Sequence, residues 1–421
     1  MNAVWLAGGV FLLTYGIIVT ERVHRTIAAL LGGLAMIVLG VIPQEQAFHA
    51  VDWNVIFLLA GMMAIANVLS ETGLFQWIAV QAVKLGKGDP FRILIVLSLV
   101  TAGTSALLDN VTIVVLIAPV TLFIAANMRI SPIPFLIAEI LASNIGGAAT
   151  LIGDPPNIII GSAAGIDFLT FASHLAPISL VILIAFIGLS RWLFRNDLRS
   201  DVNAARDHLE ALETTDLITD GLMLRKALIV MAAVALGFVL HGALNLEPAT
   251  IALAGATILM LWGRSDPHHV LREIEWTTLF FFVGLFITVE AVVHVGIIEA
   301  VAQAALRLTG GDLSLTSMLL IWMSAIVSGI VDNIPYTATM VPVVKSLGQA
   351  MPIDPLWWSL ALGACLGGNL TLVGASANVV VVSIAERSGH PISFLHFMRY
   401  GVITTFFSLV LASIYVWLRY L

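Results

Sequence analysis

Apolar segments long enough to cross a membrane follow one another along most of the chain, separated by short polar segments. A membrane-spanning helix needs about 20 mainly apolar residues. In the first half this pattern predicts single spans at 3–19, 26–43, 54–71 (continuing past Gly73 to about 83) and 174–194. The apolar stretch 91–127 is too long for one crossing, so we predict a helical hairpin with its tip at Asp109. Residues 133–165 are predicted to form one crossing, broken at Gly153-Asp154-Pro155.

The second half of the chain repeats the first. Asp109-Asn110 returns as Asp332-Asn333, a shift of 223 positions (109 to 332). Thr150-Leu151-Ile152-Gly153 returns as Thr371-Leu372-Val373-Gly374, a shift of 221 positions (150 to 371). Below, two positions related by these shifts are called repeat counterparts. The repeat predicts spans at 226–242, 249–263 and 276–305, a hairpin at 316–344, a broken crossing at 357–386 and a last span at 400–418.

Charge placement indicates that the two repeats lie upside down relative to each other. Five crossings and a returning hairpin give each repeat an odd number of crossings. If the polar linker after Arg191 is cytoplasmic, every basic residue except Arg307, Lys345 and Arg419 falls on the inner side. This distribution agrees with the positive-inside rule. We therefore expect a multi-pass protein of the cytoplasmic (inner) membrane, with both termini outside.

Composition supports this class of protein. Of the 421 residues, 59% are hydrophobic and only 11% are charged, whereas soluble domains carry about 25% charged residues. We predict an all-α polytopic protein with about ten transmembrane helices, two hairpins and two broken helices. Barrel strands would be shorter and would alternate apolar and polar residues. The single Cys365 excludes an internal disulfide, and no removable signal peptide is expected.

Three carboxylates coincide with the predicted hairpin tips and the first break: Asp109, Asp154 and Asp332. Each could be a helix cap, and Asp154 stands at the N-cap position of a short helix begun by two prolines. An ionisable residue inside a membrane costs about 2.5–3.5 kcal/mol, and Ser or Asn would cap without that cost. Burial also raises a carboxylate's pKa, which suits proton loading and release. We therefore predict proton coupling through these three acids.

Inverted repeats with broken helices are typical of secondary transporters, which bind substrate where the half-helix ends meet. The polar and glycine positions around these ends are the predicted substrate-binding residues: Asn110, Thr112, Gly153, Asn157, Asn333, Thr337, Asn369, Thr371, Gly374 and Asn378. In the second break Ser376 is expected to cap the following helix. Weaker candidates are Glu71, Glu139, Glu290, His294 and Cys365, and Ser143-Asn144 is expected to support the first break from behind.

The stretch SNIGGAATLIGDPPNIIIG, the paired Asp-Asn tips and the Asp/Glu-Trp pairs at 52–53 and 275–276 resemble the ArsB/NhaD group of the ion transporter superfamily. The resemblance covers essentially the whole chain. It implies relatives that export arsenite or antimonite, exchange sodium for protons, or resemble the melanosomal P protein. It also implies an elevator, with scaffold bundles at 1–90 and 226–313, transport bundles at 91–195 and 314–421, and a cytoplasmic linker at 196–225.

Proton-coupled efflux of arsenite or antimonite is the leading prediction, because the Asn/Thr cluster suits an uncharged triol. Sodium/proton antiport is the alternative, because carboxylates and free helix carbonyls suit a hard cation. The dicarboxylate carriers among the relatives have Ser-Asn-Thr at their tips, whereas fixed negative charge here would repel a dianion. An intramembrane aspartyl protease and a passive channel fit less well. We expect no enzyme activity, cofactor, bound metal or nucleic acid, and consider a homodimer and a soluble ATPase subunit as partners.

Overall fold

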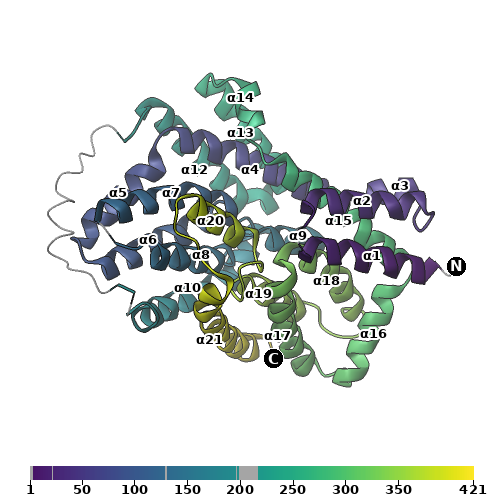
Figure 1. Ribbon diagram of the computed structural model, residues 1–421. Helices are drawn as coiled ribbons and strands as arrows, with labels where there is room; N and C mark the ends of the chain where they lie inside the picture. The colour runs from purple at the N-terminus through teal and green to yellow at the C-terminus, as the bar shows by residue number, and fades with distance from the viewer. Residues whose placement is uncertain (1–2, 21, 129, 196, 199–216) are drawn as a thin grey trace.

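The computed structural model describes residues 3–421 except 21, 129, 196 and 199–216 (Figure 1). The described residues form helices and connecting turns, with no strand among them. The first repeat contains α1 (Ala3–Thr20), α2 (Arg25–Val38), α3 (Gln44–His49), α4 (Trp53–Glu71), α5 (Leu74–Gly86), α6 (Pro90–Ser105), α7 (Asn110–Met128), α8 (Ile133–Gly147), α9 (Pro155–Ala164) and α10 (Phe168–Leu193).

The second repeat has the same order of elements. It contains α12 (Gly221–Leu244), α13 (Pro248–Gly263), α14 (Pro267–Arg272), α15 (Trp276–His294), α16 (Ile297–Thr309), α17 (Leu313–Val331), α18 (Asn333–Leu347), α19 (Asp354–Gly367), α20 (Ser376–Arg387) and α21 (Phe394–Tyr420). Helix α12 begins inside the predicted linker 196–225, and most of that linker lies outside the described residues.

Both predicted hairpins and both predicted breaks are confirmed. Helices α6 and α7 are joined just before Asn110, and α17 and α18 are joined at Asp332. The breaks separate α8 from α9 and α19 from α20. The short helices α3 and α14 were not predicted, because six residues carry too little periodicity to be recognised. The kink expected at Gly73 is a complete interruption, in which Gly73 has φ +79° and separates α4 from α5.

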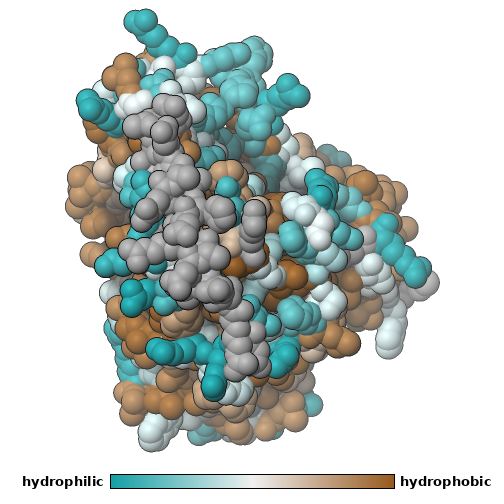
Figure 2. Space-filling view, turned by 60° about the vertical axis from the view of Figure 1, so that its left-hand side comes forward, coloured by the Kyte–Doolittle hydropathy of each residue, from teal (hydrophilic) through white to brown (hydrophobic). Residues whose placement is uncertain are grey.

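Within the described residues, eight helices are long and apolar enough to cross a membrane: α1, α4, α7, α10, α12, α15, α17 and α21. Helices α2 and α13, predicted as full spans, are shorter, with 14 and 16 residues. Figure 2 faces the end of the molecule that lies on the left in Figure 1; it shows hydrophilic residues over this end and hydrophobic residues along the flanks. The protein is therefore a multi-pass membrane protein.

The helices that precede the hairpins pack across the two repeats. Helix α4 of the first repeat lies on α13 of the second, and α15 of the second lies on α2 of the first. A Cβ atom on Gly61 would lie 2.7 Å from the carbonyl carbon of Ala252, and one on Gly284 would lie 2.4 Å from that of Ala29. These two contacts are repeat counterparts of each other. Small residues thus let both helix pairs approach closely, as is common in membranes.

The hairpin and the broken crossing of the first repeat enter the molecule from one end, and those of the second repeat enter from the opposite end (Figure 1). Helix α9 packs on α18, and α20 packs on α7, so each half-helix that follows a break lies along the hairpin of the other repeat. The two hairpin tips and the two breaks consequently come together in the interior. This arrangement places the polar residues of four separate segments at one site.

Candidate functional site

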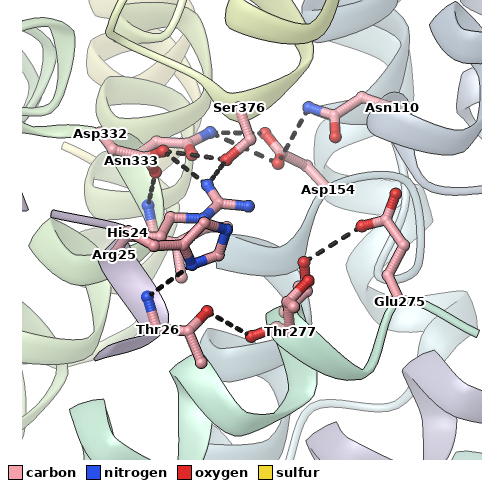
Figure 3. Close-up of polar contacts among 12 residues, drawn as sticks. His24, Arg25, Thr26, Asn110, Asp154, Glu275, Thr277, Asp332, Asn333 and Ser376 are labelled. Atoms are coloured by element: carbon pink, nitrogen blue, oxygen red, sulfur yellow. Dashed lines mark hydrogen bonds and ion pairs between the residues drawn. The ribbon is translucent and has the colours of Figure 1, made fainter. Parts of the chain in front are cut away.

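The carboxylate of Asp154 lies at the centre of the converging segments (Figure 3). Asn110, at the start of α7, donates through Nδ2 to Asp154 Oδ1 at 3.2 Å. Asn333, at the start of α18, donates through Nδ2 to Asp154 Oδ2 at 3.1 Å. Asp154 is 1% exposed. The two hairpin tips, one from each repeat, therefore hold a single buried carboxylate that the second repeat lacks, since its counterpart is Ala375.

The side-chain capping hydrogen bonds expected at the two breaks are absent from the described structure, although Asp154 does occupy the predicted N-cap position. Asp154 stands at the N-cap position of α9 with an extended backbone, but its side chain makes no capping hydrogen bond. Its oxygens instead face the two asparagine amides described above. At the second break Ala375 is the N-cap, and Ser376 is the first helical residue. The Ser376 hydroxyl donates to Asp332 Oδ2 at 2.9 Å.

Asp109 and Asp332 do make the hydrogen bonds expected of caps. Asp109 Oδ2 accepts from the backbone N–H of Thr112 at 3.0 Å, and Asp109 Oδ1 accepts from the Thr112 hydroxyl. Asp332 Oδ1 accepts from the N–H of Ile334 at 2.9 Å. Asp332 also has φ +88°, a conformation that costs a non-glycine residue about 1–3 kcal/mol and that occurs preferentially at functional sites.

Arg25 is a charged site residue that the sequence did not reveal. It is the first residue of α2, and its guanidinium lies 3.4 Å from Asp332 Oδ2 and also contacts the Ser376 hydroxyl (Figure 3). The guanidinium stacks over the Phe281 ring at 5.3 Å. Arg25, Asp332 and Ser376 line a cavity of about 270 Å³. In the sequence Arg25 reads as an ordinary loop cation, because nothing in its spacing connects it with residue 332.

Asn157 and Asn378, both predicted to bind substrate, use their amide donors to close the two breaks. Asn157 Nδ2 donates to the two carbonyl oxygens of Gly147 and Thr150, at 3.1 and 2.9 Å. Asn378 Nδ2 donates to the counterpart carbonyls of Gly368 and Thr371, at 2.7 and 2.9 Å. Each amide thereby satisfies carbonyls that the broken helix leaves without intrahelical partners. The carbonyls that were expected to be free for a cation are thus partly occupied.

A second pair of counterparts links the two breaks to each other. Asn144 Nδ2 donates to Asn378 Oδ1 at 3.0 Å, and the Cys365 thiol donates to Asn157 Oδ1 at 3.2 Å. Asn144 and Cys365 are repeat counterparts, so each break is supported by a residue of the other repeat. Asn144 Nδ2 also donates to Asn369 Oδ1 at 2.9 Å, and Asn144 Oδ1 accepts from Asn110. Asn144 was expected to support the first break, but its amide donates to residues of the second break.

Two of the predicted binding residues have a buried oxygen without a hydrogen-bond partner in the described structure. These atoms are Asn110 Oδ1 and Thr337 Oγ1. By contrast, Asn369 Nδ2 donates to the Leu141 carbonyl at 3.1 Å, and Thr371 Oγ1 donates to the Gly329 carbonyl. An unpartnered buried oxygen is costly unless a ligand or water completes it. Asn110 and Thr337 are therefore better placed to contact a substrate than Asn369 and Thr371.

Of the weaker candidates, Cys365 lies at this centre through its contact with Asn157, whereas Glu71, Glu139 and Glu290 make their hydrogen bonds elsewhere. Glu139 is buried in α8 and accepts a hydrogen bond from Thr121 at 2.5 Å. Glu290 accepts from Gln46 at 3.0 Å, which ties α15 to α3. Glu71 pairs with His269 at 2.7 Å where both side chains are more than half exposed. These contacts give the three acids structural roles at helix ends or between helices.

Gly153 allows the first break to pack against the hairpin. A Cβ atom at this position would lie 2.6 Å from the carbonyl oxygens of both Gly147 and Ser105. We predict that Gly153→Ala destabilises the protein by about 1–3 kcal/mol or more, because backbone atoms must move. Gly188→Ala is the matched control, since a Cβ there meets nothing within 4 Å. Thermal unfolding in detergent checks this, and equal melting temperatures would contradict it.

The site is rich in hydrogen-bond acceptors and in negative charge. Asp109, Asp154 and Asp332 are joined by Glu275, whose side chain lies on the side of Asp154 away from Asp332 in Figure 3. Among the described residues, Arg25 is the cation that pairs with one of these acids, Asp332. The amide donors of Asn110, Asn144, Asn157, Asn333 and Asn378 are committed to protein oxygens. Among the described residues, no three His, Cys, Asp or Glu side chains are grouped so as to hold a metal ion.

Opposed hairpins, two broken crossings and a buried polar centre define a membrane transporter. The chain belongs to the CitMHS family, whose model is described as "Citrate transporter" and matches residues 15–363. An "Uncharacterized transporter" of Mycobacterium tuberculosis is 48% identical over 98% of this chain and 97% of that protein. The human "P protein" is 36% identical over 94% of this chain and 58% of its own length. The finer placement in the ArsB/NhaD group stays a prediction.

The fold also has a counterpart among solved structures. The crystal structure of the Alcanivorax borkumensis YdaH transporter superposes with a TM-score of 0.57, covering 99% of this chain and 98% of that one. The sequence identity is 14%, so the similarity concerns the fold alone. The transporter class and the all-helical fold predicted from the sequence are confirmed.

Proposed function

We propose that this protein is a proton-coupled secondary active transporter that exchanges protons for a small monovalent cation, with sodium as the first candidate. The observation that carries the proposal is the buried Asp154 carboxylate at the junction of both hairpins and both breaks. Carboxylate and amide oxygens are the ligands that hard cations prefer. Asp154, the unpartnered Asn110 Oδ1 and the nearby carboxylates supply this chemistry.

Efflux of arsenite or antimonite, the leading prediction from the sequence, becomes the second candidate. An uncharged triol needs acceptors for its hydroxyl protons, and Asp154 and Asn110 Oδ1 offer them. It also needs donors, and the amide donors of this site are committed to protein oxygens. Because few donors are left for an uncharged triol, sodium is favoured over arsenite or antimonite as the substrate.

Citrate is the substrate that the family description names. A free citrate carries several negative charges at neutral pH. It would have to approach Asp109, Asp154 and Asp332 with Arg25 as the contacting cation, and that cation already pairs with Asp332. Like charges at short range in a medium of low dielectric repel strongly. We therefore do not propose free citrate.

We propose an elevator mechanism, in which the hairpins and broken helices (91–195 and 314–421) move against the bundles 1–90 and 226–313. The cross-repeat hydrogen bonds of Asn144 and Cys365 support this division, because they bind the two transport bundles into one unit. The close contacts of Gly61 and Gly284 support a rigid scaffold in the same way. Asp109, Asp154 and Asp332 are the proposed proton-coupling residues. We place the protein in the cytoplasmic membrane with both termini outside.

Transport by the purified protein in liposomes tests the proposal. With an imposed pH gradient, we expect proton-driven movement of radioactive sodium and no movement of citrate. Collapse of the gradient with a protonophore should stop sodium movement. Proton-driven arsenite movement without sodium movement would favour the second candidate. Citrate transport, or uptake that persists without the gradient, would overturn the proposal.

A further inference from the structure

The turn between α1 and α2 and the turn between α12 and α13 are repeat counterparts, but they contact the transport bundles at different levels. The first turn meets the beginning of α20, where Arg25 touches Ser376 and lines a cavity with Val379. The second turn meets the segment beyond the end of α9. There His241 Nε2 accepts from the N–H of Phe168 at 2.9 Å.

The first turn contacts the start of its half-helix, α20, whereas the second turn contacts residues just past the end of its half-helix, α9. The two contact points therefore differ by about the length of one half-helix. The counterpart of Ser376 is Pro155, the first residue of α9, yet the second turn contacts Asp167 and Phe168 instead. Helix α9 has 10 residues, which span about 15 Å at 1.5 Å per residue. A shift of the transport bundles moves the two contacts in opposite directions relative to their repeats, so the bundles lie displaced by about half that distance from the position that would make the two turns equivalent. An exchange of the two levels would generate a second state, with the displacement reversed.

We propose that Arg25 is a positioning residue that holds the transport bundles in the observed state through Asp332 and Ser376. The inference rests on the elevator part of the proposed function. Arg25 belongs to the scaffold, and both of its polar partners belong to the transport bundle of the second repeat. A displacement of about 15 Å separates these groups, so the contact exists in one state only.

The contact has no equivalent in the other repeat. The counterpart of Arg25 is Pro248, which has no charge, and the counterpart of Ser376 is Pro155. Asp109, the counterpart of Asp332, takes the hydrogen bonds described for it from Thr112. A charge pair that is partly exposed and contributes to one state alone shifts the balance between two states. Arg25 therefore favours the observed state over its counterpart.

Cysteine pairs can report the two states separately. A Cβ atom on Gly242 would lie 3.8 Å from Cβ of Asp167, within the range for a disulfide. Gly242→Cys/Asp167→Cys should therefore cross-link in the observed state. The counterpart pair, Val19→Cys/Ser388→Cys, should cross-link only after the displacement has reversed. Cys365 is fully buried and leaves the background clean.

The decisive measurement is the initial rate of copper-phenanthroline cross-linking of both pairs in membranes, with and without Arg25→Gln. We expect Arg25→Gln to speed formation of the Val19–Ser388 link about fivefold. This factor corresponds to the upper end of the stabilisation that exposed ion pairs provide, here lost from the observed state. The Gly242–Asp167 link should form more slowly. Arg25→Lys keeps the charge and should restore most of the original ratio, which a merely structural role would not do.

Two outcomes would overturn the inference. One is an unchanged ratio of the two rates in Arg25→Gln, provided that the protein elutes as a single species from size-exclusion chromatography. The other is full transport by the Gly242–Asp167 cross-linked protein. Cross-linking needs no substrate, so a wrong choice of transported ion leaves this test intact. Conversely, sodium transport together with an unchanged ratio would spare the proposed substrate and reject the role of Arg25.

Discussion

Asp154→Asn is expected to abolish transport, by at least about 100-fold, while the protein still folds. Asparagine has nearly the same shape, and its single oxygen at the Oδ1 position can still accept from Asn110 at 3.2 Å and from Asn333 at 3.3 Å, so the packing of both hairpin tips should persist. It cannot carry a negative charge or release a proton at neutral pH. If Asp154 provides the charge that alternates between a proton and a cation, both halves of the exchange are lost. Sodium and proton fluxes in liposomes measure this directly.

Asp52→Asn is the matched control for this substitution. Asp52 caps α4 through its Oδ1, which accepts from the N–H groups of Asn54 and Val55 at 3.0 and 3.2 Å. Its Oδ2 accepts from the Ser162 hydroxyl of α9, and an asparagine amide in the same place can donate to that hydroxyl. Asparagine caps helices about as well as aspartate. This variant should therefore transport at close to the original rate. Proton-coupled transport that survives Asp154→Asn would exclude Asp154 as the coupling residue and leave Asp109 and Asp332.

The sequence was sufficient to predict where the chain breaks and returns, because these features leave local signals. Two prolines after Asp154 cannot continue a helix, and an apolar stretch of 91–127 cannot be a single span. The internal repeat then confirmed each feature in the second half. It also predicted that the Asp-Asn tips would meet the breaks. The amides of Asn110 and Asn333 on Asp154 realise that prediction.

The individual roles of the polar residues could not be predicted, because they depend on contacts between distant segments. Asn157 and Asn110 are equally polar and equally close to a break or tip. The amide of Asn157 donates to carbonyl oxygens seven and ten residues earlier in the chain, whereas Asn110 keeps a side-chain oxygen without a hydrogen-bond partner. Arg25 is separated from Asp332 by 307 positions, and its side chain reaches the site only through the packing of α2. Such pairings follow from the assembled fold, and residue type alone carries no signal of them.

Asn144→Ala is expected to produce the largest loss of stability among single substitutions at the site. Asn144 is fully buried and joins three other asparagines: its Nδ2 donates to Asn369 and Asn378, and its Oδ1 accepts from Asn110. Alanine leaves these partners without the hydrogen bonds. Each buried group left unsatisfied costs about 1–3 kcal/mol, so the total should be about 3 kcal/mol or more. A large fall in melting temperature in detergent would show it.

Two further variants separate this effect from a simple loss of volume. Asn144→Cys copies the residue of the other repeat and keeps a weak donor toward Asn378, so its melting temperature should fall less than that of Asn144→Ala. Asn127→Ala removes one exposed amide that donates to the Phe123 carbonyl within α7, and should change stability by about 0.5 kcal/mol or less. Equal losses in Asn144→Ala and Asn127→Ala would contradict the cross-repeat network. The union of the two transport bundles would then rest on the other hydrogen bonds that cross between them, such as those made by Asn333, Cys365 and Asn369.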